Sequence, residues 1–519
     1  MKNTIKAMPL LLLALCSCEA GDFQEPEPSS GREDIVINNG EPITLLCDLN
    51  GLLPTTNTEP TEQQPTVFRS IQDIADEFCA MFPNVTIEWA YSKKSVGDWA
   101  QWMTTQVAAK DAPDIVMMHG SEYSDRGWYE DLTDVMEEPN PFIEAGERGA
   151  DRWKDLFPDY MWLSDMTTDA ANRICAVPVM CYPGTATAYF YNKEIFAELG
   201  LSVPKDWEEF KDVCAAINRA GYVAVAPWSL NASANVDVWD IQFSLGPTYA
   251  EKIKDQWDYD GNGYMTQDEK LRATYEGTFY GQGRNRANIL SLYREVRFKY
   301  QNILQTGAAS TNYQPLWTSG QVGMMEDGMW RLKDENVDAA RKFDYGIFPT
   351  PLANGKTSVF AADFKMGDGA YNPPISESFN IVKQASLQKG EGHFEASKLF
   401  LMWLTVPKNI DRMVDELAGS SVGAVRGTII PPQIATYLQG EFPRSPNCSW
   451  TSGVTVATQT KMSRYFQYWI QDKYDDAKFL SYYDKELHQG CLDMMAALGI
   501  DGSSWVDGYD PEFDYSSIA

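Results

Sequence analysis

Histidine and basic residues are scarce in this sequence of 519 residues. It contains 3 histidines, and its 43 lysines and arginines stand against 73 aspartates and glutamates, which gives a formal net charge of −30. No HExxH pattern occurs, so the zinc-protease motif is excluded. A chain this acidic repels phosphate backbones and anionic lipid headgroups, and we therefore expect no binding to nucleic acid.

Cysteine motifs are also missing. None of the 9 cysteines forms a CxxC pair, and no Cys/His cluster has the spacing of metal ligands. We expect buried thiols; Cys175 and Cys181 are close enough in sequence for a disulfide, which the sequence alone leaves open. Glycine (37) and proline (28) occur at globular levels, which excludes disorder and collagen.

No apolar run is long enough to cross a membrane. Two lysines precede the apolar block 8–15, which is typical of a secretory signal. Residues 15–18, Leu-Cys-Ser-Cys, resemble the lipobox of bacterial lipoproteins, with Cys18 as the lipidated residue. Plain secretion is the alternative. We predict an exported bacterial lipoprotein at the outer face of the cytoplasmic membrane or in the periplasm, with a signal peptide at 1–17 and a lipid-anchored linker at 18–35.

Strand and helix patterns alternate in the first part of the chain. Residues 43–47, 85–89 and 114–118 are typical of strands. Residues 68–82 and 98–109 instead repeat apolar side chains at helical spacing. Farther along, Asp206 and Glu209 have the spacing of a capping box, which predicts a helix that runs to about residue 219. This alternation indicates an α/β fold with a mostly parallel sheet, and the length suggests two or three such units.

Eight segments occur in the order and at about the spacing of a known family. They are 71–78 (IQDIADEF), 82–85 (FPNV), 109–116 (AKDAPDIV), 177–178 (VP), 191–196 (YNKEIF), 200–210 (GLSVPKDWEEF), 319–330 (SGQVGMMEDGMW) and 343–346 (FDYG). Over most of its length the chain thus resembles the carbohydrate-binding family of extracellular solute-binding proteins of ABC importers, which includes the maltose-binding proteins.

The resemblance implies a two-lobed α/β fold of the periplasmic-binding-protein type II, with the lobes joined by crossover strands at a hinge. It implies crossovers near 176–178, 326–328 and 369–372. The first lobe would then comprise residues 36–177 and 328–370, and the second lobe residues 178–327 and 371–519.

A calcium-binding pattern lies in an insertion at about residues 250–280. Residues 258–269 (DYDGNGYMTQDE) match the diagnostic positions of an EF-hand loop, with oxygen donors at positions 1, 3 and 5 and glycine at position 6. An Asp/Gly-rich surface loop is the alternative. We predict a structural Ca²⁺ site whose ligands are Asp258, Asp260, Asn262, Tyr264 through its carbonyl, Thr266 through water, and Glu269.

A sugar site needs aromatic rings for C–H faces and carboxylates or amides for hydroxyl groups. Such side chains follow several predicted strands, where an open sheet binds its ligand. The candidate ligand-binding residues are Asp48, Asn50, His119, Glu122, Tyr123, Tyr182, Trp228, Asn231, Glu326, Asp327, Trp330, Asp363, Tyr371 and Arg426.

An enzyme is the competing interpretation. Residues 419–423 (GSSVG) match a nucleophile-elbow pattern, and Asp475 and His488 follow in the hydrolase order. The elbow needs a strand before its serine, whereas a helix is predicted at 409–417, so we predict no catalysis.

We predict instead a monomeric protein, anchored to the membrane through its lipid. It would capture a neutral carbohydrate, for which we predict an oligosaccharide, and deliver it to ABC permease subunits with their ATPase. A surface glycan hydrolase or esterase, and a glycan receptor without a transporter, remain the alternatives.

Overall fold

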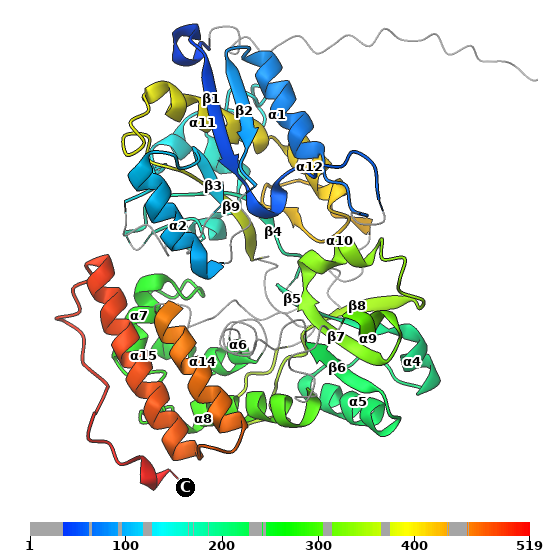
Figure 1. Cartoon of the computed structure of the whole chain (residues 1–519). Coiled ribbons are helices and arrows are strands. Elements are labelled where there is room, and N and C mark those ends of the chain that lie inside the picture. The colour runs from blue at the N-terminus through cyan, green and yellow to red at the C-terminus, as the bar shows by residue number, and fades with distance from the viewer. Residues whose placement is uncertain are drawn as a thin grey trace, which may run out of the picture. The chain divides into compact units, whose positions relative to one another are not determined.

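The computed structural model places two sheets in two groups of elements, each with its own helices (Figure 1). This is the predicted two-lobed α/β architecture. The residues that the structure describes are 35–61, 65–91, 96–117, 127–164, 166–169, 171–184, 186–227, 241, 245–304, 314–364, 374–432, 434, 454 and 456–518.

The first lobe holds a six-stranded sheet in the order β10-β4-β9-β3-β1-β2. Strand β1 runs parallel to β2 and β3, while β9 runs antiparallel to β3 and β4. The sheet is therefore mixed, and the prediction of a mostly parallel sheet was wrong because β9 enters it from a distant part of the chain. Its strands are β1 (Ile43–Asp48), β2 (Val85–Trp89), β3 (Ile115–Met117), β4 (Val177–Cys181), β9 (Ile375–Ile381) and β10 (Val422–Gly423).

Amphipathic helices cover this sheet. Helix α1 (Ser70–Met81) buries Ile71, Ile74 and Phe78, in agreement with the predicted periodicity. Its first amides lack partners within the helix, and the carboxylate of Glu416 accepts from the N–H groups of Arg69 and Ser70 at 2.8 Å each. The other main helices of this lobe are α2 (Val96–Ala109), α11 (Glu391–Leu404) and α12 (Pro407–Glu416).

The second lobe holds a four-stranded sheet in the order β6-β7-β5-β8. Strand β5 lies between β7 and β8 and is antiparallel to both, and β6 is parallel to β7. The strands are β5 (Thr187–Asn192), β6 (Val223–Pro227), β7 (Val322–Gly328) and β8 (Tyr345–Pro349).

A hydrophobic cluster joins this sheet to its helices. Helix α5 begins at the predicted cap, where Asp206 accepts from the N–H of Glu209 at 3.0 Å. The carboxylate of Glu209 accepts in return from the N–H of Lys205 at 2.9 Å, one residue before the expected position.

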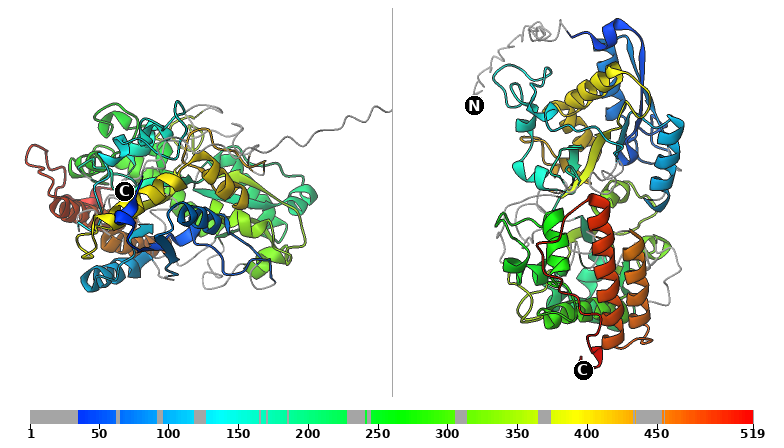
Figure 2. Two further views of the ribbon diagram at one scale, coloured as in Figure 1. Left: turned by 90° about the horizontal axis from the view of Figure 1, so that it is seen from above. Right: turned by 90° about the vertical axis from the view of Figure 1, so that its left-hand side faces the viewer.

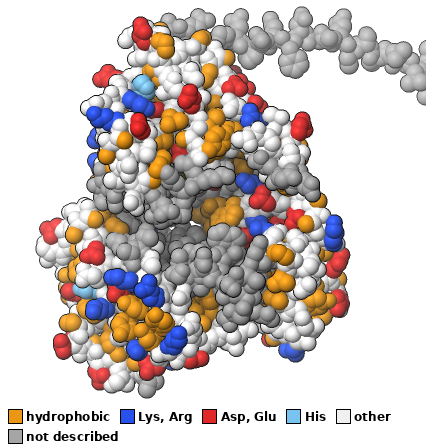
Figure 3. All heavy atoms as spheres, viewed as in Figure 1, with side chains coloured by type: hydrophobic (Ala, Val, Ile, Leu, Met, Phe, Trp, Pro, Cys, Tyr) orange, Lys and Arg blue, Asp and Glu red, His pale blue; other side chains and the backbone are white. Residues whose placement is uncertain are grey.

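Hydrophobic side chains ringed by Lys and Arg lie over α14 and α15 (Figure 3). The main helices are α4 (Lys193–Glu198), α5 (Trp207–Arg219), α8 (Arg286–Phe298), α14 (Val456–Ile470) and α15 (Asp476–Leu498).

Short helices connect these elements of the fold, which Figure 2 shows from two further sides. The α-helices are α6 (Gly246–Glu251), α7 (Gln267–Tyr275), α9 (Gln314–Thr318) and α10 (Leu332–Glu335), and a π-helix, η8, spans Lys299–Ile303. The 3-10 helices are η1 (Ile37–Gly40), η2 (Asn50–Leu52), η3 (Val135–Glu137), η4 (Trp153–Leu156), η5 (Asp159–Leu163), η7 (Lys254–Gln256), η10 (Met329–Arg331) and η12 (Tyr515–Ser517).

The predicted lobe boundaries need correction. Because β4 belongs to the first sheet and β5 to the second, the first crossover lies at 182–186 and not at 176–178. Strand β8 pairs with β5, so the segment 328–370 assigned to the first lobe carries a strand of the second. Strands β9 and β10 pair within the first sheet, so the segment 371–519 does not belong wholly to the second lobe.

The described cysteines, Cys175 and Cys181 included, are free thiols, and most are buried. Within the described ranges, no helix combines the length and apolar character that a membrane span requires.

Buried Asp484 ties the C-terminal segment to α15. Its carboxylate accepts from the N–H groups of Gly281 at 2.6 Å and Gln282 at 2.9 Å, and from the hydroxyl of Tyr515 at 2.7 Å. Burial raises the pKa of Asp484 to about 7, although these hydrogen bonds act in the opposite direction. The folded protein therefore binds a proton here more tightly than the unfolded chain does.

This raised pKa predicts a pH-dependent stability. The contribution is complete below the ordinary aspartate pKa of about 4 and is lost as the pH rises through about 7. We expect the melting temperature of the wild type to fall relative to that of Asp484→Asn as the pH rises from about 5 to about 8. Thermal melting measures this, with exposed Asp493→Asn on the same helix as control. Parallel pH profiles of wild type and Asp484→Asn would contradict the prediction.

Candidate functional site

Two aromatic side chains meet where the chain leaves the sheets. Tyr182 directly follows β4, and Trp330 lies in η10, directly after β7. Their ring centroids are 5.5 Å apart with an interplanar angle of 60°. Gly328 permits this arrangement, because a Cβ there would lie 2.2 Å from atoms of the Trp330 ring. Both rings are partly exposed and can present surface to a ligand.

A carboxylate from the central strand of the first lobe lies in the same region. Glu377 belongs to β9, and a Cβ added to Gly51 in η2 would lie 3.3 Å from its Oε1 atom. Burial raises the pKa of Glu377, although Ser376 donates a hydrogen bond to its carboxylate. Burial, and then the charge of Glu377, raise the pKa of Tyr182 as well. The carboxyl group of Glu377 thus lies near enough to Tyr182 to affect its hydroxyl group electrostatically.

One backbone hydrogen bond aligns the segments that pass between the sheets. The N–H of Tyr182 donates to the carbonyl of Pro374 at 2.9 Å. Tyr182 starts the first crossover, and Pro374 ends the segment that returns the chain from β8 to β9. The Tyr182–Trp330–Glu377 group therefore lies at the connection of the two sheets, where hinge motion would change its geometry.

Two predicted site residues at the end of β7 are already engaged within the protein. Glu326 is buried, and its Oε1 accepts from the ammonium group of Lys299 at 2.6 Å. Asp327 is fully buried, accepts from the N–H of Gly328 at 2.7 Å, and lies 3.5 Å from Arg331. Burial raises the pKa of Asp327 to about 7. These contacts give both carboxylates a role in holding β7 and η10.

The remaining described candidates divide into two groups. Asp48, which is buried, is the last residue of β1, and Asn50, which is exposed, begins η2 next to Gly51. Asp363 instead accepts from the N–H of Gly355 at 2.7 Å, and the guanidinium of Arg426 donates to the carbonyl of Phe157 at 3.1 Å. Both of these latter side chains are exposed and stabilise loops. Candidates that lie outside the described residues are His119, Glu122, Tyr123, Trp228, Asn231 and Tyr371.

Comparison with known proteins identifies the family. The chain matches the family model of the bacterial extracellular solute-binding proteins over residues 62–410, which is more than half of its length. The chain belongs to this family. No curated protein matches it at a significant level.

Solved structures of solute-binding proteins have the same fold as this one. A chitin oligosaccharide binding protein is 15% identical with a TM-score of 0.57, and the match covers 87% of this chain and 99% of that one. RafE in complex with raffinose is 16% identical with a TM-score of 0.54 and coverages of 87% and 99%. A sugar transporter protein from Bacillus licheniformis, in complex with stachyose, is 13% identical with a TM-score of 0.51 and coverages of 86% and 100%. At these identities the likeness concerns the fold.

In this solute-binding protein the residues of the hydrolase pattern have other tasks. Ser421 is buried next to β10 of the first sheet, whereas Asp475 caps α15 in the second lobe by accepting from the N–H of Lys478 at 2.8 Å. His488 lies 3.0 Å from the hydroxyl of Tyr280 through Nδ1. Ser421 therefore lies in the first lobe, whereas Asp475 and His488 both belong to α15 of the second lobe, and family members are binding proteins.

Sequence reasoning missed Glu377. The signal was available, since a carboxylate interrupts the strand-forming segment 375–381 (ISESFNI), and a charged residue inside a buried strand requires a partner or a ligand. It was missed because the pairing of this strand with β3 and β4 is non-local.

The contact between Gly328 and Trp330 can be tested by a double-mutant cycle. Gly328→Ala forces its Cβ into the ring, and overpacking of this kind typically costs about 1–3 kcal/mol. In a Trp330→Ala background, Gly328→Ala should lower the free energy of unfolding only slightly, because the ring is absent. Thermal melting of the wild type, the two single variants and the double variant gives the coupling free energy between the two positions. Equal effects of Gly328→Ala in both backgrounds would show that the ring does not occupy this position.

Proposed function

We propose that this solute-binding protein captures a neutral oligosaccharide between its lobes and delivers it to an ABC permease with its ATPase. The observation that carries the proposal is the group of Tyr182, Trp330 and Glu377 at the connection of the two sheets. Aromatic faces pack against the C–H faces of sugar rings, and a carboxylate accepts from their hydroxyl groups.

Charge supports a neutral ligand. The formal net charge of −30 disfavours anionic solutes such as phosphorylated sugars. Three solute-binding proteins with this fold are named for, or contain, chitin oligosaccharide, raffinose and stachyose, which are oligosaccharides. Solute capture then follows a population shift from open to closed lobes, and the monomer in its closed form presents both lobes to the permease.

Isothermal titration calorimetry of the mature chain against a panel of chito-, galacto- and malto-oligosaccharides tests this proposal. We expect one oligosaccharide class to bind, and Trp330→Ala to weaken that binding at least about tenfold, because loss of ring stacking costs on the order of 1.4 kcal/mol. Trp330→Phe, which keeps a ring, should retain most of the affinity. Glu377→Gln should weaken binding without a change of ring packing.

Two outcomes would contradict the proposal. One is that no sugar of the panel gives a measurable heat of binding. The other is that Trp330→Ala, Trp330→Phe and the wild type bind equally, which would place the solute elsewhere. Chromatography of the titrated sugar detects cleavage, and product formation would support an enzyme.

We further propose that the protein is held at the cell envelope through lipid on Cys18, which lies outside the described residues. The lipobox-like residues 15–18 support this position. Cys18→Ala should move the protein from the membrane fraction to the soluble fraction and abolish labelling with radioactive palmitate. Cys16→Ala is the matched control and should leave both unchanged. Retention of the label in Cys18→Ala would refute the assignment.

A further inference from the structure

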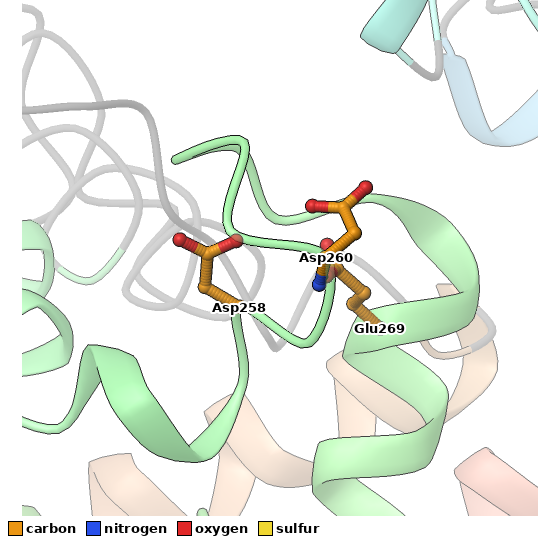
Figure 4. Close-up of side chains that lie close together, drawn as sticks. All are labelled: Asp258, Asp260 and Glu269. Carbon is orange, nitrogen blue, oxygen red and sulfur yellow. The ribbon is translucent and has the colours of Figure 1, made fainter.

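Three carboxylates converge in a loop of the second lobe. Oxygen atoms of Asp258, Asp260 and Glu269 all lie within 4.8 Å of one another. The two aspartates come from the loop after η7, and Glu269 comes from the first turn of α7 (Figure 4). Glu269 is 4% exposed, and the ammonium group of Lys254 lies 3.8 Å from Asp258. Three neighbouring carboxylates repel one another, so a cation bound among them would stabilise this loop.

The backbone brings the oxygen donors together. Gly263 has φ +84°, a conformation that favours glycine, and its N–H donates to both carboxylate oxygens of Asp258 at 3.2 and 3.3 Å. The chain thereby turns back at position 6 of the twelve-residue pattern. Met265, at position 8, is buried in the hydrophobic cluster of the second lobe and anchors the loop.

Position 7 of an EF-hand loop binds the ion through its main-chain carbonyl, so the side chain at this position is available for packing. Tyr264, at position 7, stacks its ring on Tyr160 of η5, with centroids 6.2 Å apart and an interplanar angle of 5°. Binding of an ion by the main-chain carbonyl of Tyr264 is compatible with this packing, because the ring need not face the ion.

An ordinary helix cap explains only part of the arrangement. Thr266 and Glu269 form a capping box at the start of α7. The other oxygen of Glu269 accepts from the N–H of Tyr259 at 2.8 Å and so reaches back across the loop. The box requires neither Asp258 nor Asp260, and it does not account for donors at positions 1, 3 and 5, glycine at position 6 and glutamate at position 12.

We propose that this loop binds one Ca²⁺ ion. Calcium takes six to eight oxygen ligands, and six residues of this loop can supply them while Met265 anchors the loop in the core. The bound ion would join the end of η7 to α7, which packs through Leu271 on Cys491 and Met495 of α15. Calcium is thus a structural clip of the second lobe. The ligands are the side chains of Asp258, Asp260, Asn262 and Glu269, the carbonyl of Tyr264, and Thr266 through water.

Thermal melting and calorimetry of the mature chain, stripped with EDTA and dialysed, test the site with CaCl₂ alone. At about 10 mM calcium we expect one ion per chain and a rise in melting temperature of roughly 3 °C or more, given the affinities of extracellular calcium modules. MgCl₂ should give a smaller rise, because Mg²⁺ demands octahedral geometry.

Glu269→Gln separates the metal site from the helix cap. Glutamine also serves in a capping box, but its amide nitrogen cannot accept from the N–H of Tyr259, so this variant should melt below the stripped wild type. It should lose the rise in melting temperature on addition of calcium, measured against the same variant in EDTA. Asp260→Asn should likewise lose most of the response. Asp268→Asn, at a position that carries no ligand, should keep it. A wild type without heat or melting shift, or a Glu269→Gln response equal to that of the wild type, would overturn the proposal. Neither readout involves a sugar, so the result is independent of the proposed function.

Discussion

The pairing of β9 with β3 on one side and β4 on the other is the interaction on which the rest of the structure depends. Strand β9 comes after both β4 and the entire second sheet in the chain, yet it is central in the first sheet. Directly before β9, the carbonyl of Pro374 accepts at 2.9 Å from the N–H of Tyr182, the residue directly after β4. The ladder therefore dictates where the chain passes between lobes. The same strand carries Glu377, so this constraint also positions the proposed site.

Buried charged groups tie elements together within each lobe. Asp114 is fully buried; one oxygen accepts from the N–H of Leu46 at 2.9 Å, and the other accepts from the ammonium group of Lys389 at 2.6 Å. This pair joins β1 to the segment after β9. In the second lobe the pair of Lys299 and Glu326 joins η8 to β7. Removal of one partner from such a pair typically costs about 3–5 kcal/mol, which favours lobes that move as rigid units.

Local elements could be predicted from the sequence because their signals are local. The periodicity of 68–82 matched α1, the alternation of 85–89 matched β2, and Asp206 was recognised as the cap of α5. The lobe boundaries could not be predicted in the same way, since membership of β8 and β9 in a sheet depends on partners more than a hundred residues away.

For the candidate site, the sequence predicted the types of residue better than it predicted what each residue does. Tyr182 and Trp330 were expected from their places after strands, and their rings do meet. Glu326 was expected in the site on the same argument, but it pairs with Lys299. A buried carboxylate is stabilised by a neighbouring cation, and this pairing leaves it less available to a ligand. The sequence contains no local sign of that partner.

The most direct test of the account is a crystal structure of the mature chain with a bound oligosaccharide. The account predicts that a sugar ring packs against Trp330 and Tyr182 and that a hydroxyl group donates to Glu377. A sugar bound away from the connection of the two sheets, with these three side chains free of it, would contradict the account.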